Sequence, residues 1–172
     1  MEADAAAVDA GLLLLRVLVG VVFAAHGFQK LFGWFRGGGF EGTAGWFRSL
    51  GFGDGRVAAA MAGTTEICGG LGLAAGLLTP FAAAGVIGVM TVAAHVNARE
   101  KGFWSVRNGW ELNYYLMAVA FGLAVTGPGR WSLDAALGLQ LRGLAVGLGA
   151  LLVGTGLGTL RWVTRRRDEA TA

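Results

Sequence analysis

Charged residues are scarce in this sequence. They make up 15% of its 172 residues, whereas hydrophobic residues make up 55%. An average soluble domain has charged side chains at about a quarter of its positions. The shortage argues against a soluble protein. Several apolar runs also approach the roughly 20 residues that a helix needs to cross a bilayer.

Features typical of other function classes are missing as well. Cys68 is the only cysteine, so neither an intrachain disulfide nor a CxxC pair can form. We expect Cys68 to be a small buried residue, and not a redox centre by itself. The net charge is only +3, and no basic stripe is interleaved with aromatic residues. Nucleic acid is therefore not an expected partner.

The apolar runs are continuous, whereas the strands of a membrane barrel would alternate apolar and polar residues. The sequence thus predicts an all-α integral membrane protein. Spans are expected at about residues 11–35, 57–78, 80–97, 110–126 and 143–163. Residues 11–142 would form one bundle, with 143–163 as an additional C-terminal transmembrane helix. Residues 1–10 are acidic, unlike the start of a signal peptide, and would form an N-terminal tail, as a mobile segment or a short surface helix. Residues 164–172 would form a charged cytoplasmic tail.

Short sequence signals mark the connections. In the aromatic, glycine-rich stretch 36–56, we expect Thr43 as the N-cap and Gly51 as the C′ residue of an amphipathic helix. Ser132 is expected to cap a second short helix, and Pro80 to occupy the first turn of a long one.

Glycine is abundant, with 31 residues. In membrane helices it allows close approach of backbones, and it recurs here at spacings of three, four and seven residues. Two packing seams are expected, one at Gly69, Gly72 and Gly76, the other at Gly143, Gly147, Gly154 and Gly158.

Several polar residues interrupt the apolar runs. Such groups usually face a bundle interior and find partners there. At about 1.5 Å per residue, His26 lies about 9 Å and Glu66 about 13 Å from the ends of their helices on one side of the membrane. The remaining groups lie near that same side, which predicts one intramembrane polar pocket. Its expected members are His26, Gln29, Lys30, Glu66, His95, Asn97, Glu111 and Asn113.

Within this pocket, Glu66 is the deepest charged group and has no ionisable neighbour on its own helix. We expect it to pair with Lys30 or His26 of the first helix, with Glu111 and His95 extending the pocket. Arg16 lies apart from the set. Its side chain could snorkel to the opposite interface or face the bundle.

Orientation follows from the basic residues. Eleven of the fourteen lysines and arginines lie on the pocket side, and Arg16, Arg130 and Arg142 lie on the other. The positive-inside rule places the pocket side and the C-terminus in the cytoplasm and the N-terminus outside.

Five segments follow one another in a recognisable order. They are RVLVGVVFAAHGFQKLFGWF, EGTAGWFRSLGF, TTEICGGLGLAAGLLTP, GFWSVRNGWELNYYLM and TGPGRWSLDAAL, within about residues 11–138. Together they resemble the DoxX family of small bacterial membrane proteins. The resemblance implies a four-helix membrane bundle, to which the C-terminal span is an addition. It also implies redox chemistry, because members are linked to thiosulfate:quinone oxidation in archaea and to membrane-associated redox complexes in mycobacteria.

Three functions are open at this point. In a membrane oxidoreductase subunit, Lys30 or His26 would bond a quinone carbonyl, and Glu66 or Glu111 would pass protons. In a non-catalytic scaffold the same ion pairs would only hold the bundle together. A small-molecule or proton-coupled transporter would use them as a relay. Haem ligation by His26 and His95 ranks lower, because no other sequence feature points to haem.

Quinone is therefore the candidate cofactor, and no metal site is expected. The expected partners are the lipid bilayer, membrane or peripheral redox proteins and, in a homo-oligomer, further copies of the chain.

Overall fold

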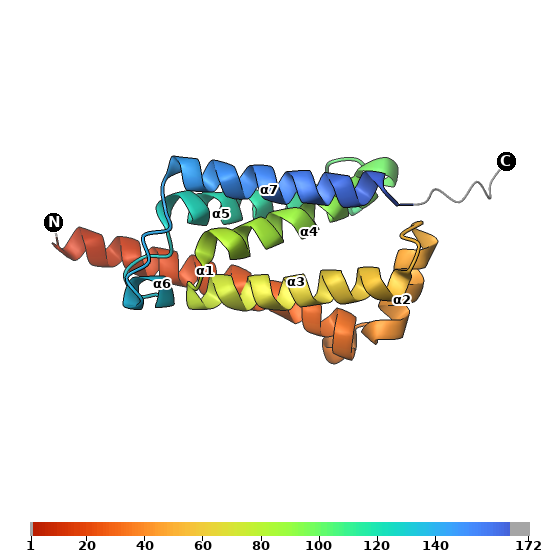
Figure 1. Cartoon of the computed structure of the whole chain (residues 1–172), viewed down its shortest axis with the longest axis horizontal. Coiled ribbons are helices and arrows are strands. Elements are labelled where there is room, and N and C mark those ends of the chain that lie inside the picture. Colours follow the sequence, from red (N-terminus) through yellow and green to blue (C-terminus); the bar gives the residue numbers. More distant parts are fainter. Residues whose placement is uncertain (1, 166–172) are drawn as a thin grey trace.

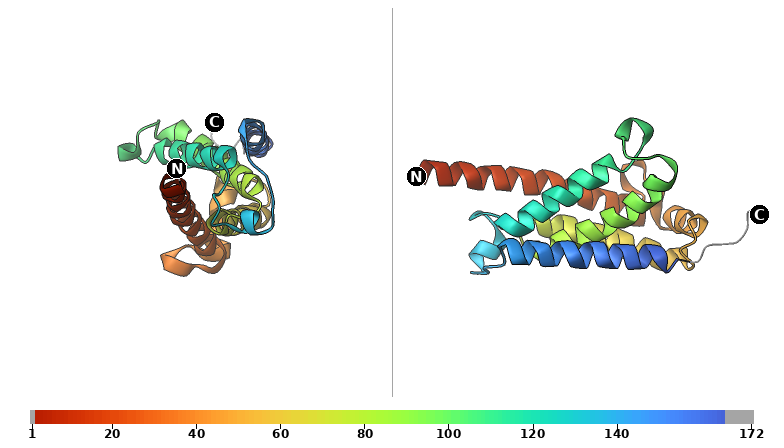
Figure 2. Two further views of the ribbon diagram at one scale, coloured as in Figure 1. Left: turned by 90° about the vertical axis from the view of Figure 1, so that its left-hand side faces the viewer. Right: turned by 90° about the horizontal axis from the view of Figure 1, so that it is seen from above.

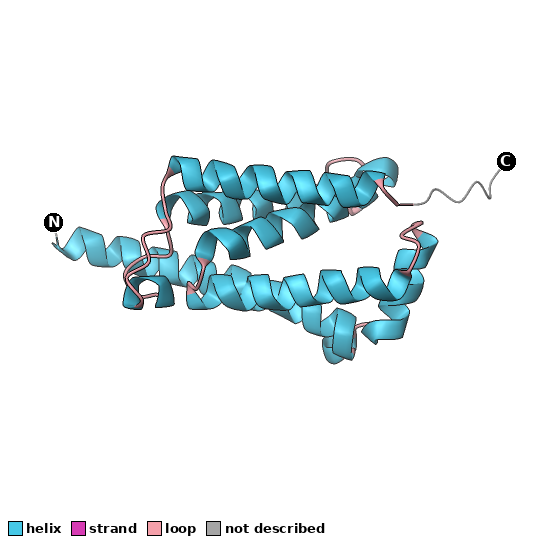
Figure 3. Ribbon diagram, in the orientation of Figure 1, coloured by secondary structure: helices cyan, strands magenta, loops and turns pink. Residues whose placement is uncertain are grey.

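A computed structural model describes residues 2–165 (Figure 1). All regular structure in that part of the chain is helical, and short loops join the helices (Figure 3), which confirms the predicted all-α class. In chain order the elements are α1 (Glu2–Phe32), η1 (Trp34–Arg36), α2 (Gly39–Ser49), α3 (Gly55–Ala75), α4 (Thr79–Glu100), η2 (Ser105–Arg107), α5 (Glu111–Thr126), α6 (Leu133–Ala136) and α7 (Leu144–Val163).

Four of the described helices are long and apolar enough to cross a membrane. They comprise Asp4–Phe32, Gly55–Ala75, Thr79–Arg99 and Leu144–Val163. The additional C-terminal helix is thus present as α7. Between them, α5 is a shorter apolar helix of 16 residues, about 24 Å long by its rise. It runs obliquely beside the longer helices (Figure 2). The chain is a multi-pass membrane protein.

The start of α1 and the end of α7 lie at opposite ends of the molecule (Figures 1 and 2). With the strong asymmetry of basic residues, we expect an external N-terminus and a cytoplasmic C-terminus. In a Cys68→Ala background, a membrane-impermeant maleimide should label Ala3→Cys in intact cells. It should label Thr171→Cys only after permeabilisation. Labelling of both positions in intact cells would contradict this topology.

The N-terminal residues differ from expectation. Residues 2–10 do not form a separate tail but continue α1 without a break. Alanine at positions 5–7 favours helix. Asp9 is also held in place by Arg130. Its Oδ1 accepts a hydrogen bond from the Arg130 backbone N–H at 2.8 Å, and its Oδ2 accepts one from the Arg130 side-chain Nε–H at 2.5 Å. This ion pair joins the first turns of α1 to the segment before α6.

Arg16 is buried and does not snorkel. Its guanidinium donates to the backbone oxygens of Ala74 and Trp131. Nearby, the carboxylate of Asp134 accepts hydrogen bonds from the backbone N–H groups of Leu78 at 2.7 Å and Thr79 at 3.0 Å. These contacts tie the α3–α4 turn to α1 and to the α6 segment at the end of the bundle farthest from α2.

The capping expectations hold in part. Ser132 caps α6, and Gly51 follows α2 with a φ of 81°, as expected. Thr43 is not an N-cap, because α2 already begins at Gly39. Its hydroxyl instead donates to the backbone oxygen of Lys30 at 3.1 Å, so that α2 packs back on the end of α1.

A close contact between α1 and α3 lies at a glycine outside the predicted seam. If Gly70 carried a Cβ atom, as alanine does, that atom would lie only 2.5 Å from the backbone oxygen of Gly20 and 2.5 Å from the backbone nitrogen of Ala24. Gly69 and Gly72 face α4 instead. Gly76 ends α3 with a φ of 64°, so it is a C-cap and not a seam residue.

The α7 seam agrees better with expectation. Cβ atoms on Gly154 and Gly158 would lie 2.6 Å from the backbone oxygens of Ala84 and Gly88 in α4. Gly147 packs against α5, whereas Gly143 precedes α7.

Cys68 is exposed on α3, so the expectation that it is buried is wrong. Its lack of a redox role stays a prediction.

The helices form two groups. Figure 1 shows α1 beside α3, with α4, α5 and α7 packed above them. The groups meet around the α3–α4 turn, where Phe23, Leu73, Ile87 and Leu123 belong to the main hydrophobic core. Toward α2, α3 and α4 diverge. A second, smaller core around Phe47 lies at that end, and between the two groups there is room for a cavity.

Candidate functional site

A cavity of about 850 Å³ lies between the two helix groups. Its walls come from α1, α3, α4, α5 and α7 and are mostly apolar, for example Phe23, Met61, Val89, Leu116 and Leu157. Its polar lining residues lie toward the α2 end of the bundle. They are His26, Lys30, Thr65, Glu66, Asn97, Lys101, Ser105, Asn108, Asn113 and Arg161.

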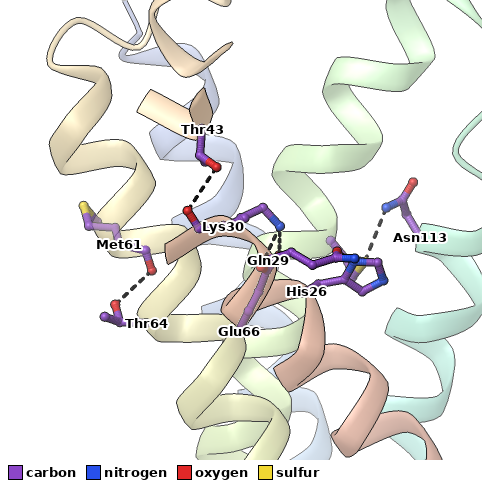
Figure 4. Close-up of polar contacts among 9 residues, drawn as sticks. His26, Gln29, Lys30, Thr43, Met61, Thr64, Glu66 and Asn113 are labelled. Carbon is purple, nitrogen blue, oxygen red and sulfur yellow. Dashed lines mark hydrogen bonds and ion pairs between the residues drawn. The ribbon is translucent and has the colours of Figure 1, made fainter. Parts of the chain in front are cut away.

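The central contact is an ion pair between α1 and α3. Lys30 Nζ lies 2.5 Å from Oε1 and 2.6 Å from Oε2 of Glu66 (Figure 4). Glu66 is 1% exposed, so Lys30 provides the charge that a buried carboxylate requires. The expected pair between Glu66 and the first helix is confirmed, with Lys30 as the partner.

His26 lies one turn before Lys30 and also lines the cavity. Its Nδ1–H donates to Oε1 of Gln29 at 3.0 Å. Gln29 does not line the cavity but orients the imidazole ring. Since Nδ1 is occupied, Nε2 is the ring atom left for a ligand.

Two asparagines link α4 to α5 across the cavity from α1. The Nδ2 group of Asn97 donates to Oδ1 of Asn113 at 3.3 Å, and that of Asn113 contacts the sulfur of Met90 at 3.3 Å. The cavity therefore has amide groups on one wall and the ion pair on another.

Two expected members lie elsewhere. The ring of His95 stacks on Trp162, with centroids 5.6 Å and planes 9° apart, and the Arg165 guanidinium also lies over that indole. Glu111 accepts a hydrogen bond from the Ser105 backbone N–H at 2.8 Å. This bond holds the pKa of Glu111, at the very start of α5, below its ordinary value. The expectation that His95 and Glu111 extend the pocket is therefore wrong.

Haem ligation by two histidines has no support in this arrangement, because His26 lines the cavity and His95 does not. Among the described residues, no group of three or more His, Cys, Asp and Glu side chains could hold a metal ion.

Sequence reasoning missed the basic residues of the cavity lining, Lys101 and Arg161. Both belong to the eleven basic residues that the sequence places on the pocket side of the bundle. They were not singled out because they lie at helix ends, where basic residues are common. The hydroxyl of Thr65 was missed because an isolated threonine in a span gives no signal.

The comparisons with known proteins give a family. A family model described as DoxX matches residues 11–98, just over half of the chain. The match includes His26, Lys30, Glu66 and Asn97, while Asn113 and all of α5, α6 and α7 lie beyond it. Neither the search of curated proteins nor that of solved structures returned a match. With its helices, its membrane spans and this match, the chain belongs to the DoxX family.

Proposed function

We propose that the chain is a membrane subunit of a redox system and that its cavity binds the headgroup of a lipophilic quinone. The observation that carries the proposal is a mostly apolar cavity of about 850 Å³ with a buried Lys30–Glu66 pair in its wall. Ligand sites of this kind combine apolar walls with a few convergent polar groups.

The polar groups suit the two carbonyl oxygens of a quinone, which need hydrogen-bond donors. The ammonium of Lys30 has three N–H donors, and the Glu66 carboxylate takes at most two of them. The amides of Asn97 and Asn113 offer donors on the opposite wall. A quinone ring between them would have one carbonyl near α1 and the other near α4 and α5.

The titratable groups of the cavity suit proton exchange. Reduction of a quinone to its quinol takes two electrons and two protons. In this proposal a partner redox protein supplies the electrons. His26 passes protons through Nε2, and Glu66 takes part as the acid–base group beside Lys30. An apolar isoprenoid tail would occupy the part of the cavity lined by Val89 and Leu116.

The test is binding of a short-chain benzoquinone to the purified protein in detergent, followed by quenching of tryptophan fluorescence. Trp46 lines the cavity and is the expected reporter. We expect saturable quenching, weakened about tenfold by His26→Leu through loss of a hydrogen bond to a polar ligand.

His95→Leu is the matched control, because His95 lies outside the cavity and its loss should leave the affinity unchanged. Absence of saturable quenching, or equal effects of the two histidine variants, would contradict the proposal. It would favour the scaffold function instead.

A further inference from the structure

A second, smaller pocket lies at the end of α7 and has no part in the proposed quinone chemistry. Its volume is about 370 Å³. It is built by the end of α7 and the start of α3, with residues that include Phe52, Asp54, Val57, Arg161, Thr164 and Arg165. By the charge distribution of the chain, this is the end of the bundle where membrane headgroups and basic side chains meet.

The pocket has basic and hydroxyl groups for an anion. The guanidinium of Arg161 lies 5.0 Å from the centroid of the Phe52 ring, which holds it over the pocket wall. Arg165 stacks on Trp162 and donates to its backbone oxygen at 2.5 Å. Thr164 adds a hydroxyl.

One carboxylate, that of Asp54, also faces this pocket. It caps α3, because Oδ1 accepts hydrogen bonds from the backbone N–H groups of Arg56 at 2.9 Å and Val57 at 3.4 Å. Its charge is therefore directed toward the helix N-terminus. The lining thus combines two guanidinium groups with one carboxylate that is already engaged in capping α3.

An apolar groove continues from the pocket toward the middle of the membrane. Phe52 and Arg161 line both the pocket and the large cavity, so the two spaces adjoin. Beyond them, Met61 on α3 and Leu157 on α7 line the cavity and are 53% and 61% exposed. Exposed apolar side chains below a basic pocket match the form of a lipid, with a charged head and an apolar chain.

We propose that this site binds an anionic phospholipid. The phosphate would lie at Arg161, with Thr164 and Arg165 beside it, and an acyl chain would run between α3 and α7 over Met61 and Leu157. Basic pockets between transmembrane helices attract anionic headgroups. The apolar groove favours a whole lipid over a free phosphate, because the acyl chain gains contacts that a soluble anion lacks.

The test is native mass spectrometry of the full chain in detergent. Phosphatidylglycerol and phosphatidylethanolamine with identical acyl chains are added in titration, with glycerol phosphate as the soluble anion. We expect phosphatidylglycerol to bind more tightly than phosphatidylethanolamine, and glycerol phosphate to remain unbound. Arg161→Gln should reduce the preference about fivefold, the effect of one basic group near an anionic headgroup.

Matched variants separate charge from fold. Arg161→Lys keeps the charge and should keep the preference. Arg36→Gln removes a basic residue that lines neither pocket and should have no effect. Met61→Trp should weaken both lipids by filling the groove. Equal binding of the two lipids, or equal effects of Arg161→Gln and Arg36→Gln, would overturn the proposal. His26→Leu should leave lipid binding intact, so this test is independent of the quinone test.

Discussion

Replacing Lys30 with methionine is expected to destabilise the protein more than replacing both Lys30 and Glu66. In Lys30→Met, the buried Glu66 carboxylate loses the ammonium at 2.5 Å, and breaking such a pair costs about 3–5 kcal/mol. In the double variant Lys30→Met, Glu66→Gln, no charge is left unpaired, so part of this loss should be recovered. The measurement is a double-mutant cycle on thermal unfolding in detergent.

A second ion pair of the same protein provides the control. Arg56 Nη1 lies 2.9 Å from Glu41 Oε1, but the two side chains are 61% and 64% exposed. Exposed pairs contribute little, because solvent screens their attraction. The same cycle on Arg56→Met and Glu41→Gln should thus show almost no coupling. If the losses at Lys30 and Glu66 were strictly additive, the pair would not stabilise the bundle, and the polar wall of the cavity would need another explanation.

Gly70→Ala in α3 is expected to be strongly destabilising. The added Cβ would lie 2.5 Å from the Gly20 oxygen and the Ala24 nitrogen, both backbone atoms that cannot rotate away. The helices must separate to admit it. Overpacking of this kind costs about 1–3 kcal/mol or more. We expect a large fall in folded protein extracted from membranes and in its unfolding temperature.

Gly122→Ala in α5 is the matched control, because nothing lies within 4 Å of its added Cβ. This variant should fold normally, since alanine has the higher helix propensity. If Gly70→Ala were as stable as Gly122→Ala, the close approach of α1 and α3 would be unnecessary for the fold.

The packing of α1 on α3 also positions the candidate site. Gly63, Glu66 and Gly70 recur at three and four residues and therefore share one face of α3. A Cβ on Gly63 would meet the side chain of Leu31 at 2.5 Å, so both glycines approach α1 closely. Glu66 lies between them and reaches Lys30 directly. The glycines thus create the short distance on which the ion pair depends.

The spans and the Lys30–Glu66 pair were predictable from the sequence. Apolar runs reveal spans because a helix in lipid must form all its backbone hydrogen bonds internally and present apolar side chains to the lipid. The pair was predictable because depth follows from the rise per residue. A buried carboxylate also needs a cation at its own depth, and Lys30 was one of two candidates on the neighbouring helix.

The rotation of each helix and the exact close contacts were decided only by the tertiary structure. His95 and Glu111 lie at the expected depth, yet one stacks on Trp162 and the other bonds the Ser105 backbone. In the same way, Gly70 makes the close contact between α3 and α1, whereas its neighbour Gly69 faces α4. Adjacent helical residues point about 100° apart. Composition and depth determined which groups share a level of the membrane. Which of them face the same cavity depends on how the side chains of α1, α3, α4, α5 and α7 pack together.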